Sequence, residues 1–190
     1  MRNLLPIIII VVILGIVVSI LKMGEEKEIP VTIVATNFEE CVGMGNPVME
    51  SYPRQCSSGG KTFTENIGNE LEKANLIRIT TPRPNTVITS PLVIRGEARG
   101  GWFFEASFPI DLKDANGVTI AQWYATVQAD PATGEVNWMT SEFVPFESTL
   151  IFENPTSTQN RNGTLILRKD NASGLPEHDD SLEIPIIFGE

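Results

Sequence analysis

The chain has very few histidine and cysteine residues, which are the side chains that most often bind transition metals and serve nucleophilic catalysis. Its 190 residues include one histidine and two cysteines. Two thiols without histidine partners do not make a structural zinc site. His178 is the only imidazole that could serve a serine or cysteine nucleophile, and no G-x-S-x-G elbow is present. Ser–Lys and paired-carboxylate chemistry stay open, although nothing marks them; we expect no catalytic residues, no metal, no cofactor and no enzyme.

Basic residues are also scarce, and they are scattered. Residues 1–22 contain Arg2 and Lys22 but no acid, so the rest of the chain carries 12 basic and 24 acidic residues, a net charge of −12. Nucleic acids and anionic lipid surfaces are bound through clustered Lys and Arg side chains. The sequence therefore predicts no nucleic-acid partner, and we attribute the acidity to solubility.

One long apolar run stands at the N-terminus. Residues 4–21 read LLPIIIIVVILGIVVSIL, which is 18 residues without a charge and makes a helix of about 27 Å. Arg2 precedes this run and the mainly acidic residues 25–28 follow it, which favours a cytoplasmic N-terminus. Residues 1–22 are thus predicted to be a cytoplasmic tip and a single transmembrane anchor, with the remaining chain outside the cell membrane.

A cleavable signal peptide, cut after Ser19, is the alternative interpretation of this run. The apolar stretch is longer than a usual signal-peptide core, and its basic leader is only three residues. Both interpretations export the chain, and they differ in whether it stays attached to the membrane.

Two short segments are expected between the anchor and the main domain. Residues 23–35 form a stalk, and residues 36–75 form a compact neck. An even cysteine count in an exported chain suggests that Cys41 and Cys56 form a disulfide, which would stabilise by about 3 kcal/mol. Within the neck, Asn37 is expected to cap a helical turn, residues 57–60 to make a hairpin turn, and Thr64 to begin a short helix that runs to Asn75.

Residues 76–190 alternate short β-patterned runs with turn signals. Every second residue from Trp102 to Leu112 is apolar, which is typical of a strand with one buried face. Residues 114–117, DANG, supply a hairpin turn. This pattern predicts an all-β fold, an immunoglobulin-like β-sandwich of about seven strands.

The order of several short motifs in this region resembles a known family. The motifs are Ser90-Pro91-Leu92 leading to Gly96-Glu97-Ala98, Phe104-Glu105-Ala106, and Asp114 through Gly117. Residues 77–188 thereby resemble the immunoglobulin-like domain associated with bacterial spore germination, called Gmad type two. The cysteine-paired neck resembles a segment found ahead of such domains in small exported proteins. The resemblance implies an envelope-facing interaction domain without established catalytic residues. Residues 167–186 depart from the family, because they are longer and more acidic.

Three places are candidate binding surfaces. Phe103 lies on the opposite face of the alternation from Trp102 and Phe104, so we expect it to be exposed. Residues 56–63 resemble the hairpin of Kazal-type protease inhibitors, which would place Tyr52 and Arg54 in a binding segment; those inhibitors depend on three disulfides, so we rank this idea low. The acidic loop 170–180 lacks the spacing of a calcium loop, and we expect it to be solvated.

Together these features predict a non-catalytic, membrane-anchored, extracytoplasmic binding module of the bacterial cell envelope. Its partner would be an envelope protein or a polysaccharide. The alternative is a structural accessory subunit that its transmembrane helix recruits to a membrane complex.

Overall fold

The computed structural model describes residues 34–130, 132–155 and 160–189. The predicted anchor and nearly all of the stalk lie outside these residues. Within the described residues, no helix is both long enough and apolar enough to cross a membrane. Residues 36–190 form one compact unit, which is described below.

The neck begins with a helix, α2 (Phe38–Gly43), and continues as a three-stranded antiparallel sheet. Asn37 caps α2 as predicted, since its side-chain Oδ1 accepts a hydrogen bond from the Glu40 amide at 2.8 Å. The sheet consists of β1 (Val48–Met49), β2 (Gln55–Ser58) and β3 (Lys61–Thr64). Gly59 and Gly60 connect β2 to β3 with φ values of 57° and 76°, which confirms the expected turn.

The predicted disulfide is present. Cys41 of α2 and Cys56 of β2 are bonded to each other, and both are fully buried. The bond therefore joins the helix of the neck to its sheet.

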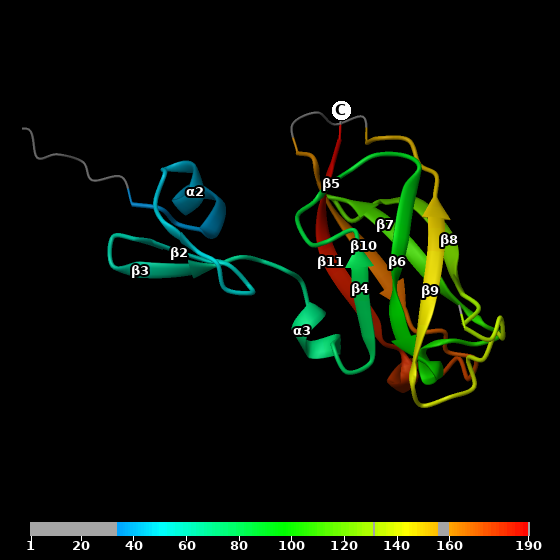
Figure 1. The fold of residues 1–190 in the computed structure, drawn as a ribbon. Helices are drawn as coiled ribbons and strands as arrows, with labels where there is room; N and C mark the ends of the chain where they lie inside the picture. Colours follow the sequence, from blue (N-terminus) through cyan, green and yellow to red (C-terminus); the bar gives the residue numbers. More distant parts are fainter. Residues whose placement is uncertain (1–33, 131, 156–159, 190) are drawn as a thin grey trace, which may run out of the picture. The chain divides into compact units, whose positions relative to one another are not determined.

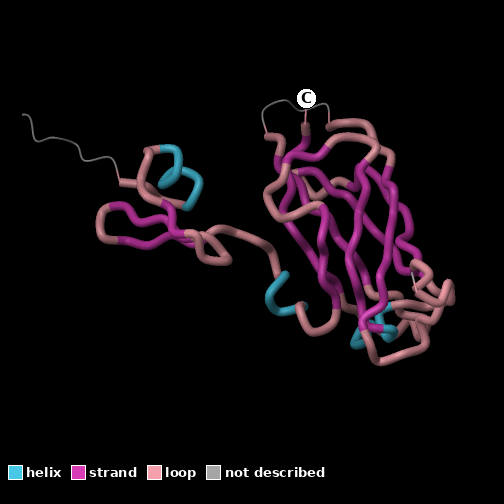
Figure 2. The backbone as a smooth tube through the Cα atoms, in the orientation of Figure 1, coloured by secondary structure: helices cyan, strands magenta, loops and turns pink. Residues whose placement is uncertain are grey.

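The predicted helix from Thr64 to Asn75 is wrong in length, because only α3 (Glu70–Lys73) is helical. The conformation and surroundings of Gly68 explain why the helix starts only after this residue. Its φ is 70°, a left-handed conformation, and a Cβ built on it would lie 1.8 Å from the Glu183 carbonyl oxygen. The chain thus turns against strand β11 (Ser181–Phe188) before α3 can begin. Figure 2 shows how little helix the described chain contains.

Eight strands build the main domain, confirming the all-β, immunoglobulin-like sandwich. They are β4 (Ile77–Thr81), β5 (Val87–Ile88), β6 (Leu92–Arg99), β7 (Ser107–Asp114), β8 (Thr119–Val127), β9 (Phe143–Leu150), β10 (Asn162–Arg168) and β11 (Ser181–Phe188). Hydrogen bonding connects them in the order β4-β6-β9-β8-β7-β10-β11-β5. All neighbours are antiparallel except β11 and β5, which are parallel.

The connected sheet folds over at β8 and β9, which pair at only two positions, Thr126 with Glu147 and Val127 with Phe146. Figure 1 shows β4, β6 and β9 as one layer and β7, β10 and β11 as a second layer behind it. Apolar side chains from both layers fill the space between them, and Phe108, Phe146 and Phe188 are among the largest that are fully buried. The period-two pattern of β7 therefore places Phe108, Ile110 and Leu112 in this core.

The expectation that Phe103 is exposed is wrong, and so is the burial expected of Phe104. Phe103 is 4 % exposed and its ring centroid lies 5.3 Å from that of Phe108, whereas Phe104 is 44 % exposed. Residues 100–102 form a 3₁₀ turn, and Glu105 and Ala106 have φ values of 49° and 62°. The alternation of β7 does not extend back through these positions, because they are not extended backbone.

Candidate binding site

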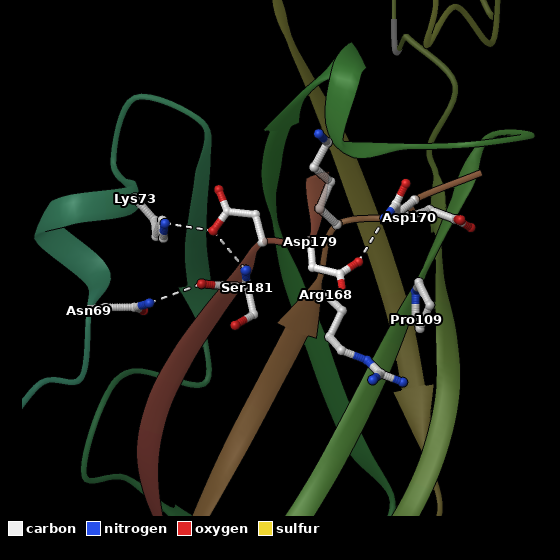
Figure 3. A pocket seen from close by; sticks show the side chains of 10 residues that line it. Asn69, Lys73, Pro109, Arg168, Asp170, Asp179 and Ser181 are labelled. Atoms are coloured by element: carbon white, nitrogen blue, oxygen red, sulfur yellow. Dashed lines mark hydrogen bonds and ion pairs between the residues drawn. The ribbon is translucent and has the colours of Figure 1, made fainter. Parts of the chain in front are cut away.

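A polar depression of about 530 Å³ lies where the ends of several elements meet. It is bordered by α3, by the end of β10, by the start of β11 and by Pro109 of β7 (Figure 3). The residues that line it are Asn69, Lys73, Pro109, Arg168, Lys169, Asp170, Asn171, Asp179, Asp180 and Ser181. It brings together cations and carboxylates from distant parts of the sequence.

One wall of the depression is attached to the sandwich through Asn69 and Lys73. The Asn69 side chain donates to the Ser181 carbonyl at 2.9 Å and accepts from the Glu183 amide at 2.8 Å. Lys73 Nζ lies 2.6 Å from Asp180 Oδ1, and both side chains are largely buried. These contacts fix the neck end of the depression to the first residues of β11 (Figure 3).

A buried carboxylate organises the opposite side. Asp111 of β7 is 4 % exposed, although its side chain lies on the outer face of the sheet. Its Oδ1 accepts from Gln122 Nε2 at 2.7 Å, and its Oδ2 lies 3.1 Å from Arg168 Nε. Both oxygens are thus occupied, as a buried charge requires. Asp111 holds the side chain of Arg168 at the edge of the depression.

The loop that follows β10 is held by its own hydrogen bonds. Asn171 Nδ2 donates to Asp179 Oδ1 at 2.7 Å, and Ser173 Oγ lies 2.5 Å from Asn171 Oδ1 and 2.9 Å from His178 Nδ1. The single hydroxyl proton of Ser173 goes to Asn171, so we assign the shared proton of the second bond to His178 Nδ1. In this arrangement His178 does not act as a base toward Ser173, and the pair stabilises the loop.

Asp170 differs from the other acids around the depression. Burial raises the pKa of its carboxyl, and the nearby Glu105 carboxylate adds to the effect. Its side chain has no hydrogen-bond partner among the described residues, whereas its amide donates to the Trp102 carbonyl at 3.0 Å. The Asp170 side chain is therefore a hydrogen-bond acceptor that is partly shielded from water.

No three His, Cys, Asp or Glu side chains converge within metal-binding reach in the described part of the chain, and this includes loop 170–180. The acids of the loop instead bind other protein groups. Asp179 accepts from Asn171, and Asp180 pairs with Lys73.

A comparison with protein families settles the relationship of the main domain. Residues 76–174 match the model of the immunoglobulin-like domain of bacterial spore germination, and this match covers more than half of the chain. The chain belongs to this family. No curated protein and no solved structure matches it.

The germination-type domain, as matched, accounts for only part of the depression. Its model ends at Gly174, before Asp179–Ser181, and begins after Asn69 and Lys73. Residues 179–181, which follow the matched range, therefore supply one border, and Asn69 and Lys73 of the neck supply another. The remaining lining residues fall within the matched range.

The candidate residues Tyr52 and Arg54 lie elsewhere, at the junction between the neck and the sandwich. The Tyr52 hydroxyl donates to Glu70 Oε2 and accepts from Arg83 Nη2, and burial followed by Glu70 raises the pKa of Tyr52. Arg54 Nη2 lies 2.6 Å from Glu65 Oε1. The structure thus gives both residues internal partners, and neither lines the depression.

Glu65 connects this junction to the sandwich. It is 7 % exposed and accepts hydrogen bonds from Arg54 and from Asn85 Nδ2, the latter at 3.1 Å. The hydrogen bonds from Arg54 are the largest cause of a lowered pKa at Glu65. The neck is therefore joined to the germination-type domain by a charged and nearly buried contact.

Sequence reasoning missed Asp111 and Arg168. Asp111 appeared only as one of the polar residues between the apolar positions of β7. Its burial and its pairing with Arg168 depend on neighbouring strands whose register the sequence does not reveal. A usable signal was that Arg168 ends a run of apolar β-residues immediately before the acidic segment.

Proposed function

We propose that the chain is a non-catalytic binding module of the bacterial cell envelope. In this proposal residues 1–22 anchor it in the cell membrane as a single helix with a cytoplasmic N-terminus. The neck and the sandwich then lie outside the membrane, where a disulfide persists. Membership of the germination-type immunoglobulin family supports an interaction role.

The observation that carries the proposal is the polar depression beside Arg168. It is open to solvent, its charged side chains come from three separate segments, and its walls are fixed by hydrogen bonds. Such a preorganised concave surface suits binding, because little conformational entropy is lost when a ligand arrives.

The partner proposed is an envelope protein or a polysaccharide, and not a nucleic acid. The net charge of the whole chain is −10, which opposes a phosphate backbone. The alternative role is that of an accessory subunit, which its membrane helix alone would recruit to a complex. The long uncharged run at residues 4–21 favours keeping this alternative.

One experiment separates the two roles. The full chain, and a version in which an unrelated apolar helix replaces residues 4–21, would be expressed with a C-terminal tag, solubilised in mild detergent and used to capture envelope proteins and wall fragments. A binding module keeps its partner in both forms. An accessory subunit loses its partner when the helix is replaced, and that result would contradict the proposal.

Membrane attachment is tested on the same two forms by alkaline extraction and by external protease. The proposal predicts that both remain in the membrane pellet and that their C-terminal domains are digested from the outside of the cell. Release of the native form by alkali, with cleavage near Ser19, would identify a signal peptide.

A further inference from the structure

We propose that the outer face around Arg168 binds a glycan that carries carboxylate groups at intervals. The proposed surface, called the Arg168 strip, consists of Tyr124, Pro109, Arg168 and Asp170. The inference rests on the proposed function, since it names a ligand class for the binding module.

Strand register places three residues of the strip in one row. Tyr124 of β8 pairs with Pro109 of β7. Leu167 of β10 pairs with Ile110 of β7, so Arg168 comes level with Pro109. Neighbouring strands are about 4.8 Å apart, so about 10 Å separates the backbones of Tyr124 and Arg168. An extended glycan laid along this row contacts both side chains at once.

The three side chains also share the outer face of the sheet. Ile110 and Leu112 are fully buried in the core, so Pro109 and Asp111 point the other way. Gln122 and Arg168 both bind Asp111, which places them on the same outer face. Tyr124 is two residues from Gln122 and therefore shares this face, with 54 % of its surface exposed.

Arg168 presents unused donors in a fixed orientation. Its Nε lies 3.1 Å from Asp111 Oδ2 as an ion pair, while its terminal nitrogens have no partner among the described residues. Because Asp111 is buried and also holds Gln122, the guanidinium is anchored at one end and exposed at the other. Planar guanidinium donors bind carboxylates in a two-point geometry. Figure 3 shows Arg168 extending beside Pro109 at the edge of the depression.

The rest of the strip favours a sugar. Tyr124 and Pro109 offer apolar surfaces against which the C–H face of a sugar ring packs. The side chain of Asp170 is an acceptor without a hydrogen-bond partner in the described chain, and sugar hydroxyls are donors. The chain is acidic, and Asp179 and Asp180 border the depression, so a ligand with closely spaced charges would be repelled. A glycan with a carboxylate on every second sugar satisfies these conditions.

The test uses the full chain in detergent micelles and a hyaluronan tetrasaccharide, which carries a carboxylate on alternate sugars. Its carboxyl-reduced, uncharged form is the matched control ligand. Affinities are measured by isothermal titration calorimetry. We expect the reduced ligand to bind at least about tenfold more weakly, because hydrogen bonds to charged groups are lost.

Variants locate the site. Arg168→Gln should weaken binding of the acidic tetrasaccharide at least about tenfold and should make the acidic and reduced ligands bind alike. Arg168→Gln removes the cationic partner of the buried Asp111, so Arg168→Lys is used beside it. Arg168→Lys keeps the charge and removes the planar donors, and it should also weaken binding. Tyr124→Ala should weaken both ligands by a similar factor, since the packing surface serves both.

Arg95→Gln is the control variant. Arg95 Nε lies 2.6 Å from Glu147 on the neighbouring strand, and its side chain is 56 % exposed, against 51 % for Arg168. It lies on β6, in the other layer, and its loss should leave affinity unchanged.

Three results would overturn the inference: no binding of the tetrasaccharide to the native chain at millimolar concentration, equal affinity for the two ligands, or unchanged binding by both Arg168 variants. Capture of an envelope partner by the native chain and equally by Arg168→Gln would then leave the proposed function standing and remove this site from it.

Discussion

The neck and the sandwich are stabilised by different kinds of interaction. The sandwich encloses a continuous apolar core to which both of its layers contribute. The described neck buries only Phe38, Cys41, Cys56 and Ile67 among its apolar side chains, and it buries the acids Glu65 and Glu70 as well. So small a core does not hold a fold by itself, and the neck adds a disulfide and charged contacts. The same chain thus combines a region held by the hydrophobic effect with one held by specific bonds.

The largest loss of stability is expected from a substitution in the sandwich core. Phe108 is fully buried, and its ring contacts those of Phe103 and Phe146 at centroid distances of 5.3 and 4.9 Å. Phe108→Ala should lower the free energy of unfolding by about 3–5 kcal/mol, because a large cavity forms. Urea unfolding of the full chain in micelles measures it. Trp123→Ala is the control, since Trp123 is 61 % exposed and its loss should cost little; equal losses would show that the assigned core is wrong.

The second-largest loss of stability is expected from removal of the disulfide, and it should be confined to the neck. Replacing Cys41 and Cys56 together by alanine removes the disulfide cross-link between α2 and β2, at a cost of about 3 kcal/mol. Hydrogen exchange read by mass spectrometry should show lost protection in residues 36–64 and unchanged protection in β6, β7 and β10. Loss of protection throughout the sandwich would mean that the two regions unfold as one unit.

A third, smaller effect concerns the turn that brings the neck against β11. Gly68→Ala should destabilise by more than about 1 kcal/mol, because it combines a left-handed φ with a Cβ 1.8 Å from the Glu183 oxygen. Gly45→Ala separates the two causes: Gly45 has φ 78° and open space around it. Thermal unfolding of both variants measures the difference. If Gly45→Ala lowered the melting temperature as much as Gly68→Ala, the close approach of Gly68 to β11 would not contribute to the loss of stability.

The smallest expected effect is a pH dependence of stability, which arises at the junction between the neck and the sandwich. Arg54 holds the pKa of Glu65 below its ordinary value of 4.5, so the stabilising contribution of Glu65 is present above that value. It is lost as the pH falls through the lower pKa of the folded state. Glu65→Gln should therefore be less stable than the native chain at pH 6, and the difference in melting temperature should shrink below pH 4. A difference that stays constant down to pH 3 would contradict the assignment.

The sequence predicted correctly those features that depend mainly on residues close together in the chain. The cap at Asn37 and the turn at Gly59 and Gly60 were predicted correctly, because each depends on short-range geometry. The disulfide followed from the even cysteine count, and the β-rich immunoglobulin-like domain followed from period-two alternation and from the family resemblance. The exposure of Phe103 was wrong, because alternation was extended across residues that are not a strand. The helix after Thr64 was wrong because Gly68 meets a strand more than 110 residues later in the sequence.

The candidate site was beyond sequence reasoning for a related reason. Its key pair, Asp111 and Arg168, is formed between strands that are neighbours only in the folded sheet. A charged residue between apolar ones is normally read as solvent-facing, and Asp111 is instead buried beneath its partners. Register and lateral order of strands are long-range properties, and single residues do not reveal them.

The corner between β8 and β9 has a consequence for self-association. Residues 119–127 of β8 contain no charge, and beyond the two paired positions this strand has no neighbour on the β9 side in the described chain. Bare, uncharged strand edges recruit copies of themselves. Here the Ser148 hydroxyl donates to the Tyr124 carbonyl at 2.9 Å, and the register shift between Leu112 and Lys113 disturbs the far end of the strand. The buried Ser148 hydroxyl thus occupies one of the carbonyl acceptors that this edge would otherwise offer to a second copy of the domain.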